Sequence, residues 1–360
     1  MKFVAFTYPG LESILKHELE QRKIEIEKVE DGLIKFIGDT STLVKTNLWL
    51  RTASKVYLLL WEHKDITDFN TLFDIIYNIN WQDIIPKWYQ IVIHPDSIKS
   101  ELTAIPTIQA ISQKAIIKKI AWDKHYNSEE WKKIEIRINL FKNTLKIMLN
   151  TTWESLYKRW YKVWTSPAQL KETLTAGIIL LSKSKNLLCY DPFCGSGTIL
   201  IEKAMIDLHI APWLFRNFMF ENFDWVNKNN LEKEKWRAKT RQKDKNLNFI
   251  GTDIDPHILK IAQNNAISAR VDKYITFYKE DFSKVKSKEN CDIITNPPYN
   301  KRLQIDNIED IYNKLNNELS QDNVHGWIIT WYDEFKYLVN KKFKMRVFSN
   351  WWDKVKFYWK

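Results

Sequence analysis

The sequence predicts an α/β protein with a mixed α+β N-terminal half and a doubly wound, largely parallel sheet in its C-terminal half. The length of 360 residues is enough for two or three domains. From residue 167 onward, strand-like and helix-like segments alternate, which is typical of parallel sheets. Residues 1–150 mix both types without that alternation. No run of about 18 apolar residues is present, which argues against a membrane span.

The first half is expected to form two α+β units, at residues 1–60 and 61–165. Apolar residues in 11–22 recur at helical spacing, and Asp31-Gly32 is a hairpin signal. The first unit is predicted to contain strand Phe3–Phe6, helix Leu11–Arg22, strands Ile24–Val29 and Gly32–Ile37, helix Thr42–Thr52 and strand Val56–Leu60. The second is predicted to contain helix Phe69–Tyr77, strand Tyr89–His94, helix Thr107–Trp122, and strands Ile134–Leu140 and Thr144–Leu149 around a Lys142-Asn143 turn.

Ser166-Pro167 marks the expected start of the third unit, residues 166–360. Its predicted strands are Leu187–Tyr190, Phe249–Gly251, Ile275–Tyr278, Ile293–Thr295 and Trp327–Thr330, closed by an antiparallel hairpin of Met345–Phe348 and Lys354–Trp359. Its predicted helices are Leu170–Leu181, Thr198–Leu208 and Pro256–Ala269. Residues 210–246 form an aromatic and charged insertion between a helix and the next strand.

The net charge of +11 is unevenly distributed along the chain. It is −2 over residues 1–100, +6 over 101–165 and +7 over 166–360. A basic surface beginning near residue 101 suits RNA or DNA, although a solvated lysine-rich face would give the same counts. Cys189, Cys194 and Cys291 form no paired framework, so neither disulfides nor a structural zinc is expected. Together with an N-terminus unlike a signal peptide, this suggests a cytoplasmic protein.

The segment Asp191-Pro192-Phe193-Cys194-Gly195-Ser196-Gly197-Thr198 follows a predicted strand and opens a helix. Its glycines let the backbone approach a ligand closely, and a helix N-terminus offers free N–H groups. It lacks the Gly-Lys-Ser/Thr of a phosphate loop, and an acidic residue at the strand end suits a cationic or hydroxyl-bearing ligand. An ordinary glycine turn of an α/β protein is the alternative interpretation.

Aspartates end the next two predicted strands. Asp253 could accept both hydroxyl groups of a ribose. Asp255 before Pro256 is instead typical of a helix cap. Asp281 could contact an adenine amino group, or it could be a capping aspartate.

Asn296-Pro297-Pro298-Tyr299 ends the fourth predicted strand. Two prolines remove two N–H donors and stiffen the loop, leaving carbonyl groups as acceptors. The Asn296 amide oxygen and the Pro297 carbonyl could both accept protons from one exocyclic NH2 group, and Tyr299 could stack on an extruded base. A plain proline turn is the alternative.

These four segments, in this order, resemble the class I S-adenosylmethionine-dependent amino-methyltransferases. More narrowly, the chain resembles the THUMP-domain guanine-N2 RNA methyltransferases, and most of all the short form of the bacterial 23S rRNA guanine-N2 type. The matching stretches are Pro9–Glu12, Glu154–Arg159, Leu170–Leu174, Asp191–Glu202, Ile210–Pro212 and Thr295–Leu303. Asn300 stands where the family usually has glycine, and asparagine tolerates a positive φ.

The resemblance implies a ferredoxin-like domain at 1–60, a THUMP RNA-binding domain at 61–165 and a Rossmann-like methyltransferase domain at 166–360. It implies catalysis by Asn296, Pro297, Pro298 and Tyr299, without a metal. It implies that S-adenosylmethionine is bound by Leu170, Glu172, Thr173, Asp191, Phe193, Cys194, Gly195, Ser196, Gly197, Thr198, Asp253, Ile254, Asp281, Phe282 and Asn296. The expected protein is a monomer acting on 23S rRNA. Transfer RNA, N6-adenine methylation and a non-catalytic role in ribosome assembly are the alternatives.

Tryptophan and glycine counts are both unusual. The chain has 8 glycines and 17 tryptophans, and their sum equals the roughly 25 glycines expected at average usage. Tryptophan stands where the family resemblance leads us to expect glycine, or where a turn is expected, at Trp153, Trp160, Trp213, Trp331, Trp351 and Trp352. We therefore hypothesise that UGA specifies glycine in this gene and that the sequence renders it as tryptophan. The alternative is a tryptophan-rich protein that stacks indoles on RNA.

Overall fold

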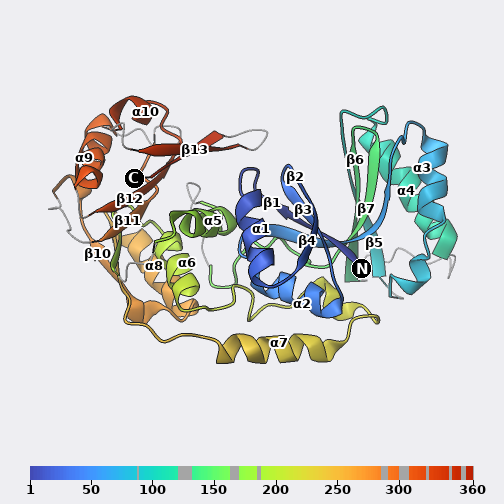
Figure 1. Cartoon of the computed structure of the whole chain (residues 1–360), viewed down its shortest axis with the longest axis horizontal. Coiled ribbons are helices and arrows are strands. Elements are labelled where there is room, and N and C mark those ends of the chain that lie inside the picture. Colours follow the sequence, from blue (N-terminus) through green and yellow to red (C-terminus); the bar gives the residue numbers. More distant parts are fainter. Residues whose placement is uncertain are drawn as a thin grey trace.

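The chain folds around two seven-stranded sheets that lie side by side (Figure 1). The computed structural model describes residues 1–86, 89–120, 132–162, 170–184, 188–284, 291–299, 308–321, 324–339, 343–349 and 354–359. Within these ranges, no helix combines the length and the apolar character needed to cross a bilayer. The predicted Ser166-Pro167 boundary, Asn300, Trp351 and Trp352 lie outside the described residues.

The first sheet has the strand order β2-β3-β1-β4-β7-β6-β5. Its strands are β1 (Lys2–Thr7), β2 (Glu25–Glu30), β3 (Leu33–Ile37), β4 (Ala53–His63), β5 (Tyr89–Ile98), β6 (Lys132–Phe141) and β7 (Thr144–Asn150). Its helices are α1 (Glu12–Gln21), α2 (Thr40–Trp49), α3 (Phe69–Tyr77) and α4 (Ile105–Ile120). Because β4 pairs with both β1 and β7, the two predicted N-terminal units share one continuous sheet.

Local sequence explains most of these elements. The Asp31-Gly32 hairpin forms, with Gly32 at a φ of 73°. The Lys142-Asn143 turn places both residues at positive φ, as a tight hairpin with right-handed strand twist requires. The helix predicted over Thr42–Thr52 is shifted: α2 starts after the Asp39 cap and ends at Trp49, and extended backbone begins at Ala53.

The second sheet has the order β10-β9-β8-β11-β12-β14-β13. Its strands are β8 (Leu188–Asp191), β9 (Asn248–Asp253), β10 (Ile275–Lys279), β11 (Asp292–Thr295), β12 (His325–Thr330), β13 (Lys344–Ser349) and β14 (Lys354–Trp359). Its helices are α5 (Glu172–Ser182), α6 (Thr198–Asp207), α8 (Pro256–Ser268), α9 (Ile308–Ser320) and α10 (Phe335–Leu338). The first five strands are parallel, and β14 is antiparallel to both β12 and β13, which confirms the predicted hairpin.

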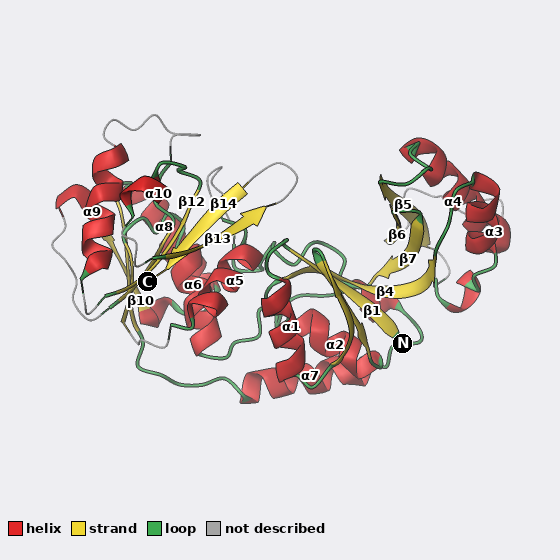
Figure 2. Cartoon of the chain, turned by 45° about the horizontal axis from the view of Figure 1, so that its top comes forward, coloured by secondary structure: helices red, strands yellow, loops and turns green. Residues whose placement is uncertain are grey.

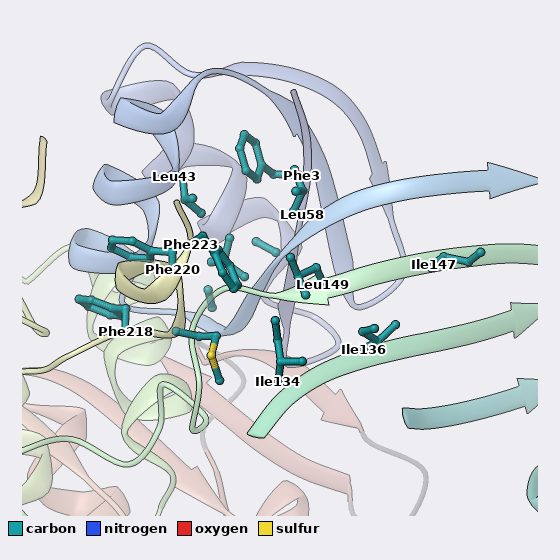
Figure 3. Packing of buried hydrophobic residues seen from close by; sticks show 14 of the residues in the cluster. Phe3, Leu43, Leu58, Ile134, Ile136, Ile147, Leu149, Phe218, Phe220 and Phe223 are labelled. Carbon is teal, nitrogen blue, oxygen red and sulfur yellow. The ribbon is translucent and has the colours of Figure 1, made fainter. Parts of the chain in front are cut away.

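Residues 210–246 connect the two halves. They contain helix α7 (Lys228–Thr240), which the sequence did not predict and which runs along α2 (Figures 1 and 2). Phe218, Phe220 and Phe223 pack in the core of the first sheet beside Leu43 and Leu149 (Figure 3). The insertion therefore leaves the second sheet and completes the core of the first.

A tight turn places the first sheet against the second half. Gly10 has a φ of 96°, and a side chain there would collide with Phe348 of β13. The carboxylate of Glu12 accepts hydrogen bonds from the N–H groups of Gly10 and Gly32, which holds the turn. Leu11 packs directly against Gly177 of α5. The Pro9–Glu12 stretch is thus part of the contact between the two halves.

A second connection between the halves is fully buried. The Arg159 Nε donates to Glu202 Oε1 of α6 at 2.8 Å, and both side chains have no exposed surface. The Tyr161 hydroxyl donates to the same Glu202 oxygen at 3.0 Å. Another Arg159 nitrogen donates to the carbonyl oxygen of Arg51, in the first half. Helix α6 is therefore tied to the segment between α2 and β4.

Candidate active site

The strand order of the second sheet reverses between β8 and β11. From β8 the chain moves outward to β9 and β10, and then returns to β11 on the other side of β8. Ligands of doubly wound sheets bind at the carboxyl ends of the strands beside such a reversal. Asp191 ends β8, Asp253 ends β9, Asp281 follows β10 and Asn296 follows β11. The structure therefore brings all four predicted segments to one edge of the sheet.

The backbone of the loop from Asp191 to Thr198 adopts a left-handed conformation at two positions. Gly195 and Gly197 have φ values of 51° and 81°, which explains why glycine occupies both positions. No atom lies within 4 Å of where a Gly195 side chain would begin, so the loop borders open space there. By contrast, a side chain at Gly197 would press on Phe277 and Ala262. The loop is therefore open at Gly195 and tightly packed at the start of α6.

Asp191 is a fully buried carboxyl group without a cationic partner among the described residues. Its Oδ1 accepts hydrogen bonds from the Thr295 hydroxyl at 2.7 Å and from the Phe193 N–H at 3.2 Å. Its Oδ2 is buried and has no hydrogen-bond partner within the described ranges. Burial raises the pKa of Asp191 to about 7, although these hydrogen bonds favour the charged form. Such a group is suited to a ligand that brings a positive charge or an N–H donor.

Asp253 faces the same loop. Its Oδ2 accepts from the Gly195 N–H at 3.1 Å, and its Oδ1 accepts from the Asp255 N–H at 3.0 Å. Burial raises the pKa of Asp253 above its usual range. Each oxygen keeps a further lone pair for a hydroxyl donor. Asp255 caps α8 with Pro256 in the first turn, as the sequence predicts.

Asp281 is more exposed than the other two aspartates. Its carboxylate accepts hydrogen bonds from the Ser283 hydroxyl and N–H, and these lower its pKa. This is the capping role that the sequence allowed as an alternative, and the other oxygen lies 3.8 Å from the Lys284 ammonium. Phe282 stacks edge-on against Phe193 with ring centroids 4.9 Å apart, which joins this segment to the loop after β8. Ile254 is 64% exposed beside Asp253.

Asn296 presents a second buried acceptor. Its Oδ1 has no hydrogen-bond partner in the described part of the chain. It follows Thr295, whose hydroxyl holds Asp191, so the two unpaired oxygens lie at the carboxyl ends of the adjacent strands β8 and β11. Tyr299 is 8% exposed and packs against Trp331 with ring centroids 5.0 Å apart.

The remaining predicted residues lie around this edge. Leu170 and Cys194 are buried in one core cluster, and α5 packs on α6. Glu172 is buried in an ion pair with Lys162, and Thr173 is buried beside it. The Ser196 and Thr198 hydroxyls lie 3.3 Å apart at the start of α6. Burial raises the pKa of Cys194 well above that of an ordinary thiol, which fits a packing role.

Sequence reasoning missed two residues that act on this edge. Thr295 holds Asp191, and Tyr312 of α9 contacts the carbonyl of Pro298. The signal for α9 was present, because Ile308, Tyr312, Leu315 and Leu319 recur at helical spacing and are all buried. Among the described residues, no three His, Cys, Asp or Glu side chains are grouped to hold a metal ion.

The fold and the site together define a class I methyltransferase architecture, and comparison with known proteins identifies the family. Residues 159–354 match the model of the RMKL-like methyltransferase domain, and residues 2–57 match that of the RlmL ferredoxin-like domain. The chain belongs to the RMKL-like methyltransferase family, with a Rossmann-like catalytic fold and an N-terminal ferredoxin-like domain.

Individual relatives agree with this assignment. The chain is 33% identical to the “Putative RNA methyltransferase YpsC” of Bacillus subtilis over 82% of this chain and 78% of that protein. It is 32% identical to the ribosomal RNA large subunit methyltransferase K/L of Buchnera aphidicola subsp. Acyrthosiphon pisum, over 84% of this chain. The chain spans about half the length of that relative, since the match covers 45% of it. The structure of SMU.472 complexed with SAH has a TM-score of 0.88, 32% identity, and coverage of 99% of this chain and 97% of that one.

Proposed function

We propose that this protein transfers a methyl group from S-adenosylmethionine to the exocyclic N2 of a guanine in RNA, and that the RNA is 23S rRNA. The observation that carries the proposal is the pair of buried, unpaired acceptors, Asp191 Oδ2 and Asn296 Oδ1, at the carboxyl ends of β8 and β11. A buried acceptor without a donor costs about 1–3 kcal/mol, so its presence favours a ligand that supplies one. Two such acceptors suit amino groups and disfavour phosphates.

The residues at this edge fit S-adenosylmethionine. Asp191 offers a carboxylate to the cationic methionine end, and the open space at Gly195 lets backbone approach it. Asp253 keeps lone pairs for ribose hydroxyls, and Phe193 and Phe282 offer an aromatic wall for the adenine. The proposed set also includes Leu170, Glu172, Thr173, Cys194, Ser196, Gly197, Thr198, Ile254 and Asp281. When bound, the cofactor supplies an electrophilic methyl group on its sulfonium.

The chain's own contribution to the chemistry is orientation and a pair of acceptors. The amide oxygen of Asn296 and the carbonyl of Pro297 are proposed to accept hydrogen bonds from the two N–H groups of the exocyclic amine, which releases one proton to solvent after it has gained the methyl group. These hydrogen bonds draw the nitrogen toward a pyramidal geometry, in which its lone pair points at the electrophile. Fixed acceptors in a site shielded from water lower the barrier without reorganising during the reaction. Tyr299 is proposed to stack on the extruded base.

RNA is favoured as substrate by two independent facts. YpsC and the K/L protein are named as RNA and ribosomal RNA methyltransferases. Residues 101–165, the C-terminal part of the proposed THUMP domain, carry a net charge of +6 that suits RNA phosphates. The proposed domain boundaries are 1–60, 61–165 and 166–360, with residues 210–246 contributing to the N-terminal core. A monomer is the proposed oligomeric state.

The test is methyl transfer from labelled S-adenosylmethionine to total RNA that lacks the modification, followed by nucleoside digestion. We expect the label in N2-methylguanosine of large-subunit rRNA. Asn296→Ala should abolish transfer, while Asn264→Ala, at an exposed position on α8, serves as the matched control and should retain it.

Other outcomes identify the alternatives. Label in transfer RNA would keep the reaction and change the substrate. Label in N6-methyladenosine would change the base, because the same acceptors suit an adenine amine. Cofactor binding without transfer to any RNA would contradict the proposal and favour a non-catalytic role in ribosome assembly.

A further inference from the structure

Tyr312 on α9 contacts the loop that follows β11. Its ring is fully buried and packs against Tyr332 and Phe335, with centroids 4.6 and 5.1 Å away. Its hydroxyl oxygen lies 3.1 Å from the carbonyl oxygen of Pro298 and 2.5 Å from Thr330 Oγ1. The phenol therefore joins the Asn296–Tyr299 segment to the end of β12.

The direction of these hydrogen bonds follows from chemistry. A carbonyl oxygen only accepts, so the Tyr312 hydroxyl donates to Pro298. Its oxygen then accepts from the Thr330 hydroxyl, whose own oxygen accepts from the Tyr332 N–H at 3.0 Å. The chain of donors therefore runs one way, from the backbone of Tyr332 to the carbonyl of Pro298. Burial raises the pKa of Tyr312, which keeps it a donor.

A loop with two consecutive prolines needs such an external contact. Neither Pro297 nor Pro298 has an N–H group, so two of the backbone donors that normally hold a loop are missing. A donor from outside can still fix the loop through its carbonyl oxygens. The Pro298 carbonyl follows directly after the Asn296 and Pro297 acceptors, so its orientation constrains theirs.

We propose that Tyr312 is a positioning residue for methyl transfer, whose hydroxyl fixes the Pro298 carbonyl and thereby orients the acceptors of Asn296 and Pro297. The inference rests on the proposed function. The ring of Tyr312 contributes to the core, and the hydroxyl contributes to the loop. Tyr312→Phe separates the two, because it keeps the ring and removes the donor.

The second sheet offers a matched control. Tyr358 is 1% exposed, belongs to the same core cluster and packs on Phe335 with centroids 4.9 Å apart. Its hydroxyl is buried and has no hydrogen-bond partner among the residues that the structure describes. Tyr358→Phe therefore removes a buried phenol hydroxyl from the same cluster without touching the loop.

The experiment measures kcat, KM for S-adenosylmethionine and RNA, and melting temperature for each full-length variant. We expect Tyr312→Phe to lower kcat about ten- to hundredfold, the range that loss of one buried hydrogen bond allows. Both KM values should stay within about twofold, because the contact acts on the chemical step rather than on ground-state binding. Tyr358→Phe should leave kcat unchanged. Thr330→Val should also lower kcat, and Thr330→Ser should restore it.

The outcomes separate this inference from the proposed function. An inactive wild-type protein would overturn the proposed function and this inference with it. An active wild type with equal kcat for Tyr312→Phe and Tyr358→Phe would overturn this inference alone. If Tyr312→Phe fails to fold, the Thr330 pair decides: equal kcat for its valine and serine variants would overturn the inference.

Discussion

Glu30 of the first sheet and Asp191 of the second differ in whether a cationic side chain lies beside the carboxyl group. In the first sheet, Glu30 accepts hydrogen bonds from Lys146 at 2.6 Å and lies 3.1 Å from the Lys35 ammonium. Burial alone would raise the pKa of Glu30, but these lysines outweigh it and lower the pKa to about 2. In the second sheet, Asp191 has no cation beside it in the described residues, and burial raises its pKa to about 7.

This difference distinguishes charged groups that stabilise the fold from a charged group that is available to a ligand. Lys35 and Lys146 are each 5% exposed, and with Glu30 and Glu62 they form a network in which each charge has a partner. Such a network is complete without a ligand. Asp191 has no such partner among the residues that the structure describes, so the buried carboxylate destabilises the folded state until a ligand binds. Perturbed and unpaired groups in one place are the physical signature of a binding site.

The largest expected effect comes from removing the charge of Asp191. Because the pKa of Asp191 is raised in the fold, ionisation of this carboxyl group destabilises the folded state. The destabilisation is absent below about pH 4, grows up to about pH 7 and is constant above. Three pKa units correspond to about 4 kcal/mol as an upper value. Asp191→Asn should therefore raise the free energy of unfolding at pH 8, measured in urea, while abolishing binding of S-adenosylmethionine measured by calorimetry.

Asp281→Asn is the control for this prediction. Its carboxylate is exposed and its pKa is lowered by hydrogen bonds from Ser283, so the amide should bring no gain at pH 8. Equal stability of wild type and Asp191→Asn at pH 8 would show that the buried carboxyl carries no cost. The contrast between the two sheets would then lose its basis.

A smaller effect is expected at Trp153, where a bulky side chain occupies a left-handed backbone position beyond the end of a strand of the first sheet. Its φ of 82° lies in the left-handed region, just after β7. Trp160, Trp213 and Trp331 are described and do not share that backbone conformation. The left-handed region costs a side chain about 1–2 kcal/mol, and glycine avoids that cost. Trp153→Gly should therefore stabilise the protein by about 1 kcal/mol in urea unfolding.

Trp153→Ala controls for loss of the indole. It also removes the ring but keeps a side chain at positive φ, so it should not reproduce the gain. A glycine variant no more stable than the alanine variant would contradict the strain at this position. The intact mass of the protein from its natural source then decides whether glycine is the native residue, because a mass that includes all 17 tryptophans would refute the UGA hypothesis.

The sequence predicts which residues meet at the site, but not which hydrogen-bond donors surround them. Parallel strands bring their carboxyl ends to one edge, so Asp191, Asp253 and Asn296 could be placed together from strand order alone. Which donors surround them depends on packing between distant segments. The bond from Thr295 to Asp191 therefore had no signature in local pattern.

The insertion shows the same limit on a larger scale. Residues 210–246 lie between elements of the second sheet in sequence, so nothing local indicated that they complete the first. In the structure, Trp49 of α2 donates to Glu234 of α7 at 3.0 Å, across 185 positions. Helix α7 has few apolar residues, and its periodicity was too weak to mark it.

The smallest effect should come from the paired network, through Lys146→Met. Glu30 has a lowered pKa in the fold, so its contribution is fully present above about pH 4.5 and is lost as pH falls through about 2. Because Glu30 remains partly exposed and Lys35 remains beside it, we expect a loss of about 0.5 kcal/mol at pH 7. The urea stability of the variant and the wild type should converge as the pH approaches 2.

Lys28→Met is the matched control, since Lys28 lies 3.2 Å from Glu30 but is 62% exposed, so its substitution should change the stability little. A loss that persists at low pH would mean that Lys146 acts by packing its alkyl chain, and that charge pairing is not what distinguishes the first sheet from the second.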